Sequence, residues 1–315
     1  MKNVSRTAKF FIICAVIFCI GLVTAIAGFA AGGIKGLDKV AEKRDWLIGS
    51  PGVLTADHIE AEGFDKVEIA GDIDVYLVTE KYFSDEKWQK RCGLGDVLGK
   101  LEGTEPEAGK VLVVRGEKVK APEVEVKNGV LHIKTGKTVT RGLNLNLTSV
   151  PATPSVYIFC TEDELRSIEV NGLSGDISLY GVSYDKASID SASGDVLMEG
   201  TKGKGTGLSL LSGDLEISGK LDGSTTIDSA SGDIDLSGKL TGDIKISSAS
   251  GDVEFDTDLA SKEYAINVSA LAGDLKVSEG GESSTLDEYP VTYKRGGEPN
   301  SLTIEALSGD IDLSF

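Results

Sequence analysis

One tripeptide, Ser-Gly-Asp, returns along the chain and constrains its fold more than any other feature. Its glycines lie 19 residues apart in five consecutive copies, and two further Gly-Asp copies follow at spacings of 22 and 36 residues. An aliphatic residue follows every aspartate. A fixed period near 20 residues in a β-rich chain is typical of a stacked repeat architecture. The glycines and aspartates are Gly175, Asp176, Gly194, Asp195, Gly213, Asp214, Gly232, Asp233, Gly251, Asp252, Gly273, Asp274, Gly309 and Asp310.

Each repeat carries two strand halves and two turns. In the fourth repeat Ile227 precedes the turn and Ile234 follows it, but strict alternation is broken at the Ser-Gly-Asp segment. A corner there restores inward-facing aliphatics, since glycine adopts a left-handed conformation and aspartate accepts backbone hydrogen bonds. We therefore assign these glycines and aspartates to structural turns. The predicted fold class is all-β, a parallel β-solenoid built from ~19-residue Ser-Gly-Asp repeats. Antiparallel hairpin repeats are the alternative.

An apolar run near the N-terminus, residues 10–31, contains no charged side chain. Its 22 residues span ~33 Å as a helix, enough to cross a hydrocarbon core of ~30 Å. Lys2, Arg6 and Lys9 precede it, and the positive-inside rule then keeps the N-terminus cytoplasmic. We expect an N-terminal transmembrane helix and a single-pass protein of the cell membrane whose bulk is extracytoplasmic. The alternative is that this run belongs to a signal peptide cleaved at Ala25-Ile26-Ala27, which would leave a secreted protein.

The chain divides into five predicted segments. These are a cytoplasmic tail (1–9), the anchor (10–31), a linker (32–52), an N-terminal β region (53–160) with an insertion at 82–110, and the repeat solenoid (161–315). Within the β region, strands are predicted at 110–114 and 156–159, and Asn128-Gly129 predicts a hairpin over 124–133. A short helix is expected over 84–91 with Ser84 as N-cap. Gly71-Asp72 separates two strand segments and repeats the Gly-Asp element.

The charge of the body limits the choice of partners. After residue 31 the chain holds 29 basic and 50 acidic side chains, a net charge of −21. Nucleic acid would be repelled, so no nucleic acid partner is expected. Stacked carboxylates ~5 Å apart repel by roughly 0.8 kcal/mol in water, which backbone donors, a cation or splaying must offset. Structural corners without a cofactor are our main interpretation, and calcium at Asp195, Asp214, Asp233 and Asp252 is the alternative.

Catalytic chemistry finds little support, and no catalytic residue is predicted. The two histidines are His58 and His132, the latter expected as an exposed strand residue. No serine lies in a G-x-S-x-G elbow. The segment 200–207 lacks the Gly-Lys-Ser/Thr ending and following helix of a phosphate loop, so we expect a flexible turn between coils. An oxidising compartment permits a disulfide between Cys92 and Cys160, although nothing local pairs them.

Three features resemble the DUF4097 family of β-strand-repeat, adhesin-like proteins of bacterial envelopes. They are the Ser-Gly-Asp series over 174–313, the segment 156–158 followed by 165–170, and the strand–turn–strand at 126–133. The resemblance covers roughly residue 64 to the C-terminus and departs at the insertion 82–110 and a long loop at 278–301. It implies an exported or membrane-anchored β-solenoid from a bacterium, and it carries over no catalytic residue.

We therefore expect a non-enzymatic, adhesin-like protein that binds or scaffolds at the cell surface. Its partners are the membrane, through residues 10–31, and an envelope polymer, a host surface or a membrane signalling protein. An accessory sensor or regulator of an envelope-stress signalling system is the second interpretation, and a polysaccharide-active enzyme is the third. The chain stops at Phe315 directly after the last strand with no obvious cap, and an uncovered terminal coil would invite pairing. Its neighbour is expected to be the loop 278–301 folding back, another copy of the chain or a partner. Specificity is expected where the period breaks, at 82–110, 200–207 and 278–301.

Overall fold

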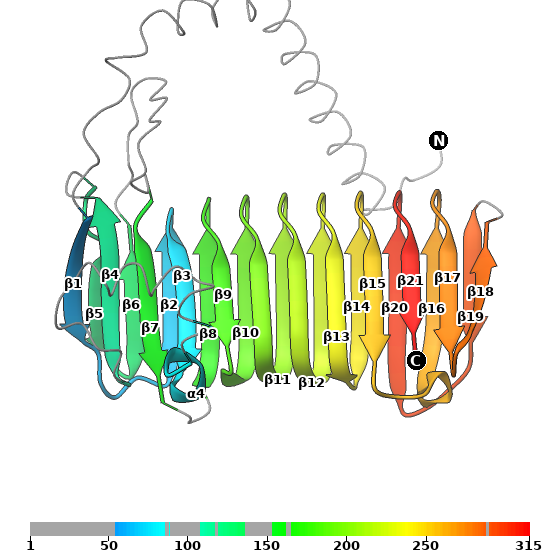
Figure 1. Cartoon of the computed structure of the whole chain (residues 1–315), viewed down its shortest axis with the longest axis horizontal. Helices are drawn as coiled ribbons and strands as arrows, with labels where there is room; N and C mark the ends of the chain where they lie inside the picture. Colours follow the sequence, from blue (N-terminus) through cyan, green and yellow to red (C-terminus); the bar gives the residue numbers. More distant parts are fainter. Residues whose placement is uncertain are drawn as a thin grey trace, which may run out of the picture. The chain divides into compact units, whose positions relative to one another are not determined.

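The computed structural model describes residues 54–85, 88, 108–116, 119–135, 153–161, 165–287 and 290–315. Within them the chain is all-β, with 21 strands, one short α-helix and one short 3-10 helix (Figure 1). None of the helices in this part of the chain is long and apolar enough to span a membrane. The predicted tail (1–9), anchor (10–31) and linker (32–52) fall outside the described residues, so they stay predictions.

The strands form two layers, and long strands connect the layers around one edge of the stack. In spatial order the first layer is β1 (Leu54–Glu60), β4 (Lys110–Gly116), β7 (Ser155–Cys160), β3 (Asp74–Thr79), β9 (Ile177–Tyr180), β11 (Val196–Leu210), β12 (Leu215–Ser229), β13 (Ile234–Leu240), β15 (Val253–Thr257), β21 (Ile311–Ser314), β17 (Leu275–Glu279) and β18 (Glu282–Leu286). The second is β5 (Glu123–Lys127), β6 (Val130–Lys134), β2 (Lys66–Gly71), β8 (Leu165–Gly172), β10 (Ser183–Ser191), β11, β12, β14 (Asp243–Ser248), β20 (Asn300–Ala306), β16 (Tyr264–Ala270) and β19 (Val291–Arg295). Strands β11 and β12 belong to both layers because each has 15 residues.

The repeat strands pair in parallel with a register of one repeat. Ile189 pairs with Leu208, Leu208 with Ile227, and Ile227 with Ile246. The repeats are therefore stacked coils, as predicted, and the antiparallel hairpin alternative is wrong for them. Among the described residues, antiparallel pairs occur only with β1, β4, β5, β18 and β19, toward the two ends of the stack.

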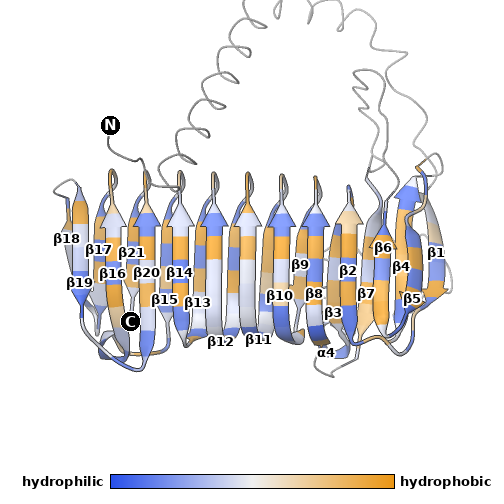
Figure 2. Ribbon diagram, turned by 180° about the vertical axis from the view of Figure 1, so that it is seen from behind, coloured by the Kyte–Doolittle hydropathy of each residue, from blue (hydrophilic) through white to orange (hydrophobic). Residues whose placement is uncertain are grey.

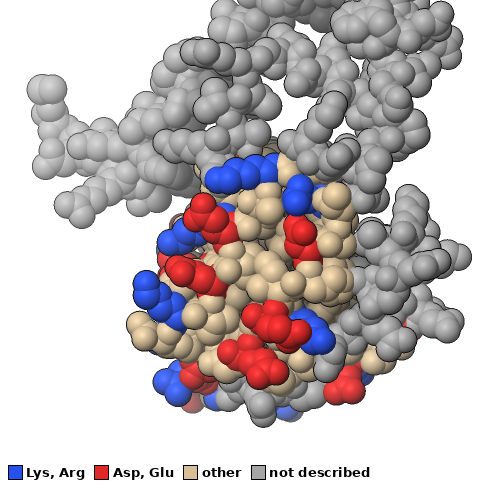
Figure 3. All heavy atoms as spheres, turned by 90° about the vertical axis from the view of Figure 1, so that its left-hand side faces the viewer, with Lys and Arg blue, Asp and Glu red and all other residues tan. Residues whose placement is uncertain are grey.

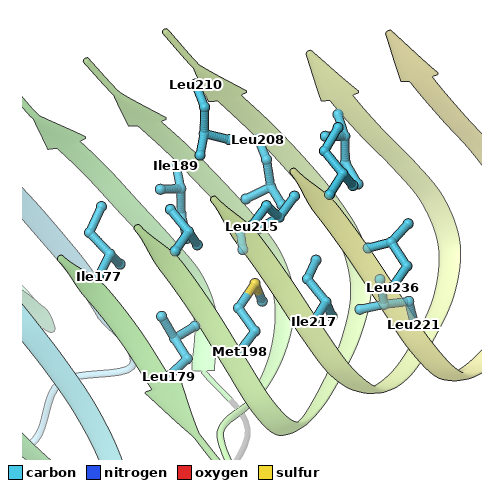
Figure 4. Packing of buried hydrophobic residues seen from close by; sticks show 14 of the residues in the cluster. Ile177, Leu179, Ile189, Met198, Leu208, Leu210, Leu215, Ile217, Leu221 and Leu236 are labelled. Atoms are coloured by element: carbon cyan, nitrogen blue, oxygen red, sulfur yellow. The ribbon is translucent and has the colours of Figure 1, made fainter. Parts of the chain in front are cut away.

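The core lies between the two layers. Side chains such as Ile177, Met198 and Ile217 from the first layer meet Ile189 and Leu208 from the second (Figure 4). Along most of the repeat strands, buried apolar residues alternate with more exposed polar ones, and Figure 2 shows hydrophobic and hydrophilic bands across the stack. Burial of each such aliphatic side chain contributes about 1.5–3 kcal/mol. Because every coil supplies the same inward positions, the repeats build one continuous core.

The order of the coils in space departs from their order in the sequence at both ends. β20 lies between β14 and β16, and β21 lies between β15 and β17. The last coil in the sequence is thus inserted one position inside the stack. Likewise β6 and β7 lie outside β2 and β3. The coil before Phe315 does not form the end of the stack, because β16 and β17 pair with β20 and β21, and β18 and β19 lie beyond them.

The predicted long loop at 278–301 is also wrong. It contains the end of β17, all of β18 and β19, and the start of β20. Gly280 and Gly281, with φ of +59° and +87°, make the turn that lets β18 fold back antiparallel on β17. β18 has no buried residue, so no apolar alternation in the sequence marks it as a strand.

Outside the repeats, the predicted hairpin is confirmed, whereas most of the predicted helix 84–91 falls outside the described residues. β5 and β6 pair antiparallel around Asn128 and Gly129, whose φ values are +53° and +78°. Before this segment lies a short helix that was not predicted, α4 (Glu80–Phe83), and Ser84 is its C-cap rather than an N-cap. Phe83 is buried, so tertiary packing positions this turn more strongly than the capping signal does. The 3-10 helix η1 (Ser261–Glu263) precedes β16.

Candidate binding surface along the Ser-Gly-Asp edge

The turns that lead from the second layer to the first follow one another along one edge of the stack. We name this row of turns, from 72–74 to 307–310 and 271–274, the Ser-Gly-Asp edge, and it lies at the top of Figure 1. The glycines here have positive φ values, which L side chains rarely adopt. These φ values are +118° (Gly175), +119° (Gly194), +121° (Gly213), +117° (Gly232), +116° (Gly251), +107° (Gly273) and +120° (Gly309).

Close approach of neighbouring coils gives glycine a second role at this edge. A Cβ atom on Gly213 would lie 2.2 Å from the carbonyl oxygen of Gly194. A Cβ atom on Gly232 would lie 2.0 Å from that of Gly213. Both distances are far below van der Waals contact, so only glycine lets the coils stack at ladder spacing here.

The aspartates form a ladder of hydrogen bonds along the same edge. The backbone N–H of each aspartate donates to Oδ1 of the aspartate in the neighbouring coil. In spatial order the ladder runs from Asp74 to Asp176 (3.2 Å), Asp195 (3.0 Å), Asp214 (2.9 Å), Asp233 (2.9 Å), Asp252 (2.8 Å), Asp310 (2.8 Å) and Asp274 (2.8 Å). Backbone donors thus offset the repulsion between stacked carboxylates.

The first rung of this ladder differs from the sequence assignment. Asp74, not Asp72, accepts the N–H of Asp176, because the turn after Gly71 is one residue shorter than the turn of the first repeat. Asp72 accepts a hydrogen bond from Ser174 Oγ at 3.0 Å instead. Burial raises the pKa of Asp74, while hydrogen bonds to its carboxylate act in the opposite direction.

The four aspartates considered for calcium, Asp195, Asp214, Asp233 and Asp252, are consecutive members of the ladder. Each has Oδ1 engaged by a backbone N–H. No group of three or more His, Cys, Asp or Glu side chains arranged to hold a metal ion occurs among the described residues. The ladder therefore supplies a structural role for these residues, and calcium stays a prediction for solution experiments.

An exposed apolar row runs beside the aspartate ladder. Leu173, Leu211 and Leu271 each stand two residues before a turn glycine, and they are 65%, 60% and 61% exposed. Equivalent positions hold half-buried residues, which are Ala192, Ala230, Ala249 and Leu307. Sequence reasoning missed this row, although the recurrence of Leu or Ala two residues before each glycine is visible in the repeats. The edge thus presents leucines on a surface whose backbone is fixed by hydrogen bonds.

An acidic row crosses the outer face of the first layer next to this edge. Its register is continuous through Glu216, Asp235, Glu254 and Asp312. Burial raises the pKa of Asp235, and the nearby carboxylates of Glu216 and Asp256 raise it further. The row ends where Lys276 forms an ion pair with Asp312. A shallow groove of about 410 Å³ lies between this part of the row and the ladder.

Cys160 lies at the end of β7 and is buried in the core. Burial raises the pKa of its thiol to about 12. The predicted partner, Cys92, falls outside the described residues. The disulfide therefore stays a prediction.

The two histidines lie in different layers of the stack. His132 on β6 is half-buried, whereas the sequence suggested full exposure, and its Nδ1 lies 3.0 Å from Oε2 of Glu68. His58 is exposed on β1. The structure thus brings neither histidine to the Ser-Gly-Asp edge.

The segment 200–207 is part of strand β11, so the expected flexible turn is wrong. Two irregularities interrupt its register with β12. A Cβ on Gly203 would lie 2.5 Å from the ring of Tyr184, and one on Gly200 would lie 2.1 Å from the hydroxyl oxygen of Tyr82. The glycines break the repeat pattern here because they make room for tyrosine side chains.

The insertion at 82–110 contributes to an aromatic cluster outside the first layer. Phe83 and Trp88 from the insertion are both buried there. Four ring pairs join the cluster, namely Tyr76–Tyr157, Phe83–Phe159, Trp88–Tyr180 and Tyr82–Tyr180, with centroids 4.6, 5.3, 5.3 and 5.8 Å apart. No pattern in the sequence reveals this second core, since its residues come from strands far apart in the sequence and from an irregular segment.

Comparison with known protein families decides the family of this chain. The model of the DUF4097 family, described as Toastrack, matches residues 56–314. The chain belongs to the DUF4097 Toastrack family. The resemblance seen in the sequence is thereby confirmed, and the match includes both the repeats and the N-terminal β region.

Solved structures similar to this Toastrack chain come from several bacteria. A "putative adhesin" from Bacteroides fragilis is 15% identical, with 83% of this chain and 97% of that chain covered and a TM-score of 0.49. A "putative cell adhesion protein" from Clostridium sporogenes is 15% identical, with coverages of 84% and 99% and a TM-score of 0.36. A "putative lipid binding protein" from Parabacteroides distasonis is 15% identical, with coverages of 83% and 97% and a TM-score of 0.43. No curated protein matches the Toastrack chain.

Proposed function

We propose that this Toastrack protein is a non-enzymatic binding or scaffold protein of the bacterial envelope, with the coil stack outside the cytoplasm. The observation that carries the proposal is the exposed leucine row on the Ser-Gly-Asp edge. Leu173, Leu211 and Leu271 remain at least 60% exposed on turns fixed by backbone hydrogen bonds. These leucines lie two and four coils apart on one rigid edge, with alanines and Leu307 at the positions between them, and such an apolar line favours an interaction surface.

The repeat geometry suits an extended partner. Equivalent positions in successive coils lie about 4.8 Å apart, so the edge offers similar contacts at regular intervals. The partner we propose is a polymer of the cell envelope, contacted by the leucines and by the adjacent row of carboxylates. Because the hydrogen bonds of the Asp ladder hold neighbouring coils together, little conformational entropy of the protein is lost when such a partner binds.

The position of β1 agrees with a membrane-proximal edge. Asp74 of the ladder pairs with Ser155 on β7, and Ser155 pairs with Val114 on β4. Leu54, the first residue of β1, pairs with Gly116, two residues after Val114 on β4. The chain therefore enters the stack at the Ser-Gly-Asp edge. The predicted linker 32–52 spans at most about 75 Å when fully extended. The Ser-Gly-Asp edge would therefore lie within this distance of the proposed membrane anchor, close to other envelope components.

The experiment uses the full chain and isolated envelope polymer from the same bacterium. A Leu173→Asp, Leu211→Asp, Leu271→Asp variant is expected to lose at least about tenfold in affinity for the polymer. Val126→Asp, at a valine that is 37% exposed on β5 and lies at the end of that strand far from the Ser-Gly-Asp edge, is the matched control and is expected to bind normally. Retained binding by the triple variant would contradict the role of the edge.

Experiments with the same chain and the same bacterium distinguish the proposed binding function from the two alternatives, a signalling sensor and a polysaccharide-active enzyme. Cross-linking in cells that captures a membrane kinase or regulator in place of polymer would favour the sensor. Release of sugar fragments by the wild-type chain would favour an enzyme. Either result, obtained without polymer binding, would overturn the proposed function.

A further inference from the structure

Both ends of the stack finish in strands that pair on one side only within the described part of the chain. β1 and β5 form one end, and β18 and β19 form the other. Beyond the leucine row, the other large hydrophobic side chains exposed among these residues are Val126 on β5 and Leu286 on β18, which are 37% and 40% exposed. The apolar core thus reaches solvent at its two ends.

One continuous row on the outer face of the second layer links Glu125 to Lys294. From Lys294 the pairing passes through Asn267, Thr303, Lys245, Thr226, Gly207, Ser188, Glu169, Glu68 and His132 to Glu125. Paired residues in a row project in the same direction. The carboxylate of Glu125 on β5 and the ammonium group of Lys294 on β19 therefore lie at the same distance from the Ser-Gly-Asp edge, at opposite ends of the stack.

The adjacent inner row shows the same correspondence for apolar side chains. It links Tyr293 to Val124 through Val268, Ile304, Ile246, Ile227, Leu208, Ile189, Val170, Ile69 and Ile133. Tyr293 and Val124 are both only partly buried against the core. Two consecutive residues on each end strand are thus matched, one apolar and one charged.

The strand directions allow the two ends to join. β5 and β19 both run away from the Ser-Gly-Asp edge, since each is antiparallel to a neighbour that runs toward it. They can therefore pair in parallel, like the strands inside the stack. In the first layer β1 runs away from this edge and β18 runs toward it, which permits an antiparallel pair.

We propose that a second copy of this chain stacks head to tail on the first, with β19 of one copy pairing in parallel with β5 of the next. In this register Lys294 meets Glu125 and Tyr293 covers Val124. Glu125 and Lys294 are exposed, and neither forms an ion pair with another described residue, so both charges are available. The end with β1 and β5 carries charged side chains of both signs among uncharged ones (Figure 3).

The contact joins two different surfaces, so it generates open chains rather than closed dimers. Pairing of edge strands supplies backbone hydrogen bonds, and the matched charges select the register. This inference is independent of the proposed function, because it involves the ends of the stack and not the leucine row.

The test measures the association of the full chain in mild detergent by sedimentation velocity over a range of concentrations. Lys294→Glu and Glu125→Lys are each expected to raise the concentration for half-association about tenfold. An equal mixture of the two variants is expected to restore association, because each charge-reversed end then meets an opposite charge on the other variant. Lys245→Glu, in the same row but in the middle of the stack, is the matched control and should associate like the wild type.

Three results would overturn the proposal. The wild type could stay monomeric at all concentrations, the mixture could associate no better than the single variants, or Lys245→Glu could weaken association as much as Lys294→Glu. All three substitutions are at exposed positions, so each variant is expected to fold, which far-ultraviolet circular dichroism verifies.

Discussion

The backbone N–H of Asp214 donates to Oδ1 of Asp195 in the neighbouring coil at 2.9 Å. Asp195→Ala removes the acceptor and is expected to lower the free energy of unfolding by about 1–2 kcal/mol in urea titrations. Asp195→Asn keeps a side-chain oxygen, so it should cost less than half as much. Asp228→Ala, at an exposed position of β12, should change stability by less than about 0.5 kcal/mol. Equal losses for the alanine and asparagine variants of Asp195 would contradict the ladder as a source of stability.

The turn glycines are expected to be far less replaceable than glycines elsewhere. Gly213→Ala places a Cβ 2.2 Å from the oxygen of Gly194 at a φ of +121°, and it should cost about 3 kcal/mol or more in thermal unfolding. A Cβ on Gly296 would meet no atom within 4 Å, and this residue has no positive φ, so Gly296→Ala should be nearly neutral. A similar melting temperature for both variants would show that the coils can separate locally at little cost.

Calcium binding can be tested directly on the aspartate ladder. Because backbone donors already engage Oδ1 of Asp195, Asp214, Asp233 and Asp252, we expect millimolar calcium to leave the melting temperature unchanged. Differential scanning calorimetry of the full chain is the measurement. A calcium-dependent rise that disappears when these four residues are changed to asparagine would establish a metal site.

The Cys160 thiol is expected to make stability depend on alkaline pH. Its pKa is raised from the usual value of 9.0 to about 12 by burial. The stabilising contribution of the neutral thiol is therefore complete below pH 9 and is lost as the pH rises from about 9 toward 12. Cys160→Ala should flatten the fall in unfolding free energy over this range.

Peptide mapping of the native chain after alkylation provides the control for Cys160. The thiol should be alkylated only after unfolding. A peptide that joins Cys160 to Cys92 would instead establish the predicted disulfide and would remove the expected dependence on pH.

Two deletions distinguish the roles of the last coil and of the strands beyond it. Removing 260–298 joins Leu259 to Pro299 and brings Asp252 and Asp310 to the 19-residue spacing. We expect β20 and β21 to keep their protection from hydrogen exchange, because β14 and β15 remain as partners. Removing 300–315 takes away the parallel partners of β16 and β17.

Residues 264–295 should then lose about 100-fold or more in exchange protection, while β12 and β13 stay protected. Exchange measured by mass spectrometry compares the two chains segment by segment. Unchanged protection of 264–295 after removal of 300–315 would contradict the inserted position of the last coil.

Much of the fold could be predicted because the repeat pattern is local. The Ser-Gly-Asp spacing and the aliphatic residue after each aspartate specify a corner and two inward-facing strands in every unit. The Asn128-Gly129 turn specifies its hairpin in the same way. The ladder role of Asp74 was not predicted, because the turn after Gly71 is one residue shorter and the ladder position therefore falls on Asp74 instead of Asp72.

The order of the coils could not be predicted, because equivalent coils carry interchangeable surfaces. Nothing in the period states whether β20 pairs with the coil before it in the sequence or with an earlier one. The leucine row was missed for a different reason. Leu210 and Leu211 are adjacent in the sequence, and only the geometry of the corner buries one and exposes the other.

The inserted position of the last coil also determines when the C-terminal part of the molecule can be completed. A chain that is synthesised from its N-terminus presents residues 264–295 before residues 300–315. During that interval β16 and β17 have no parallel neighbour, because their partners β20 and β21 come later. The earlier coils can form one by one, but the final 50 or so residues must close together. A nascent chain that stalls before residue 300 is therefore left with exposed strand edges, which makes it a substrate for proteolysis.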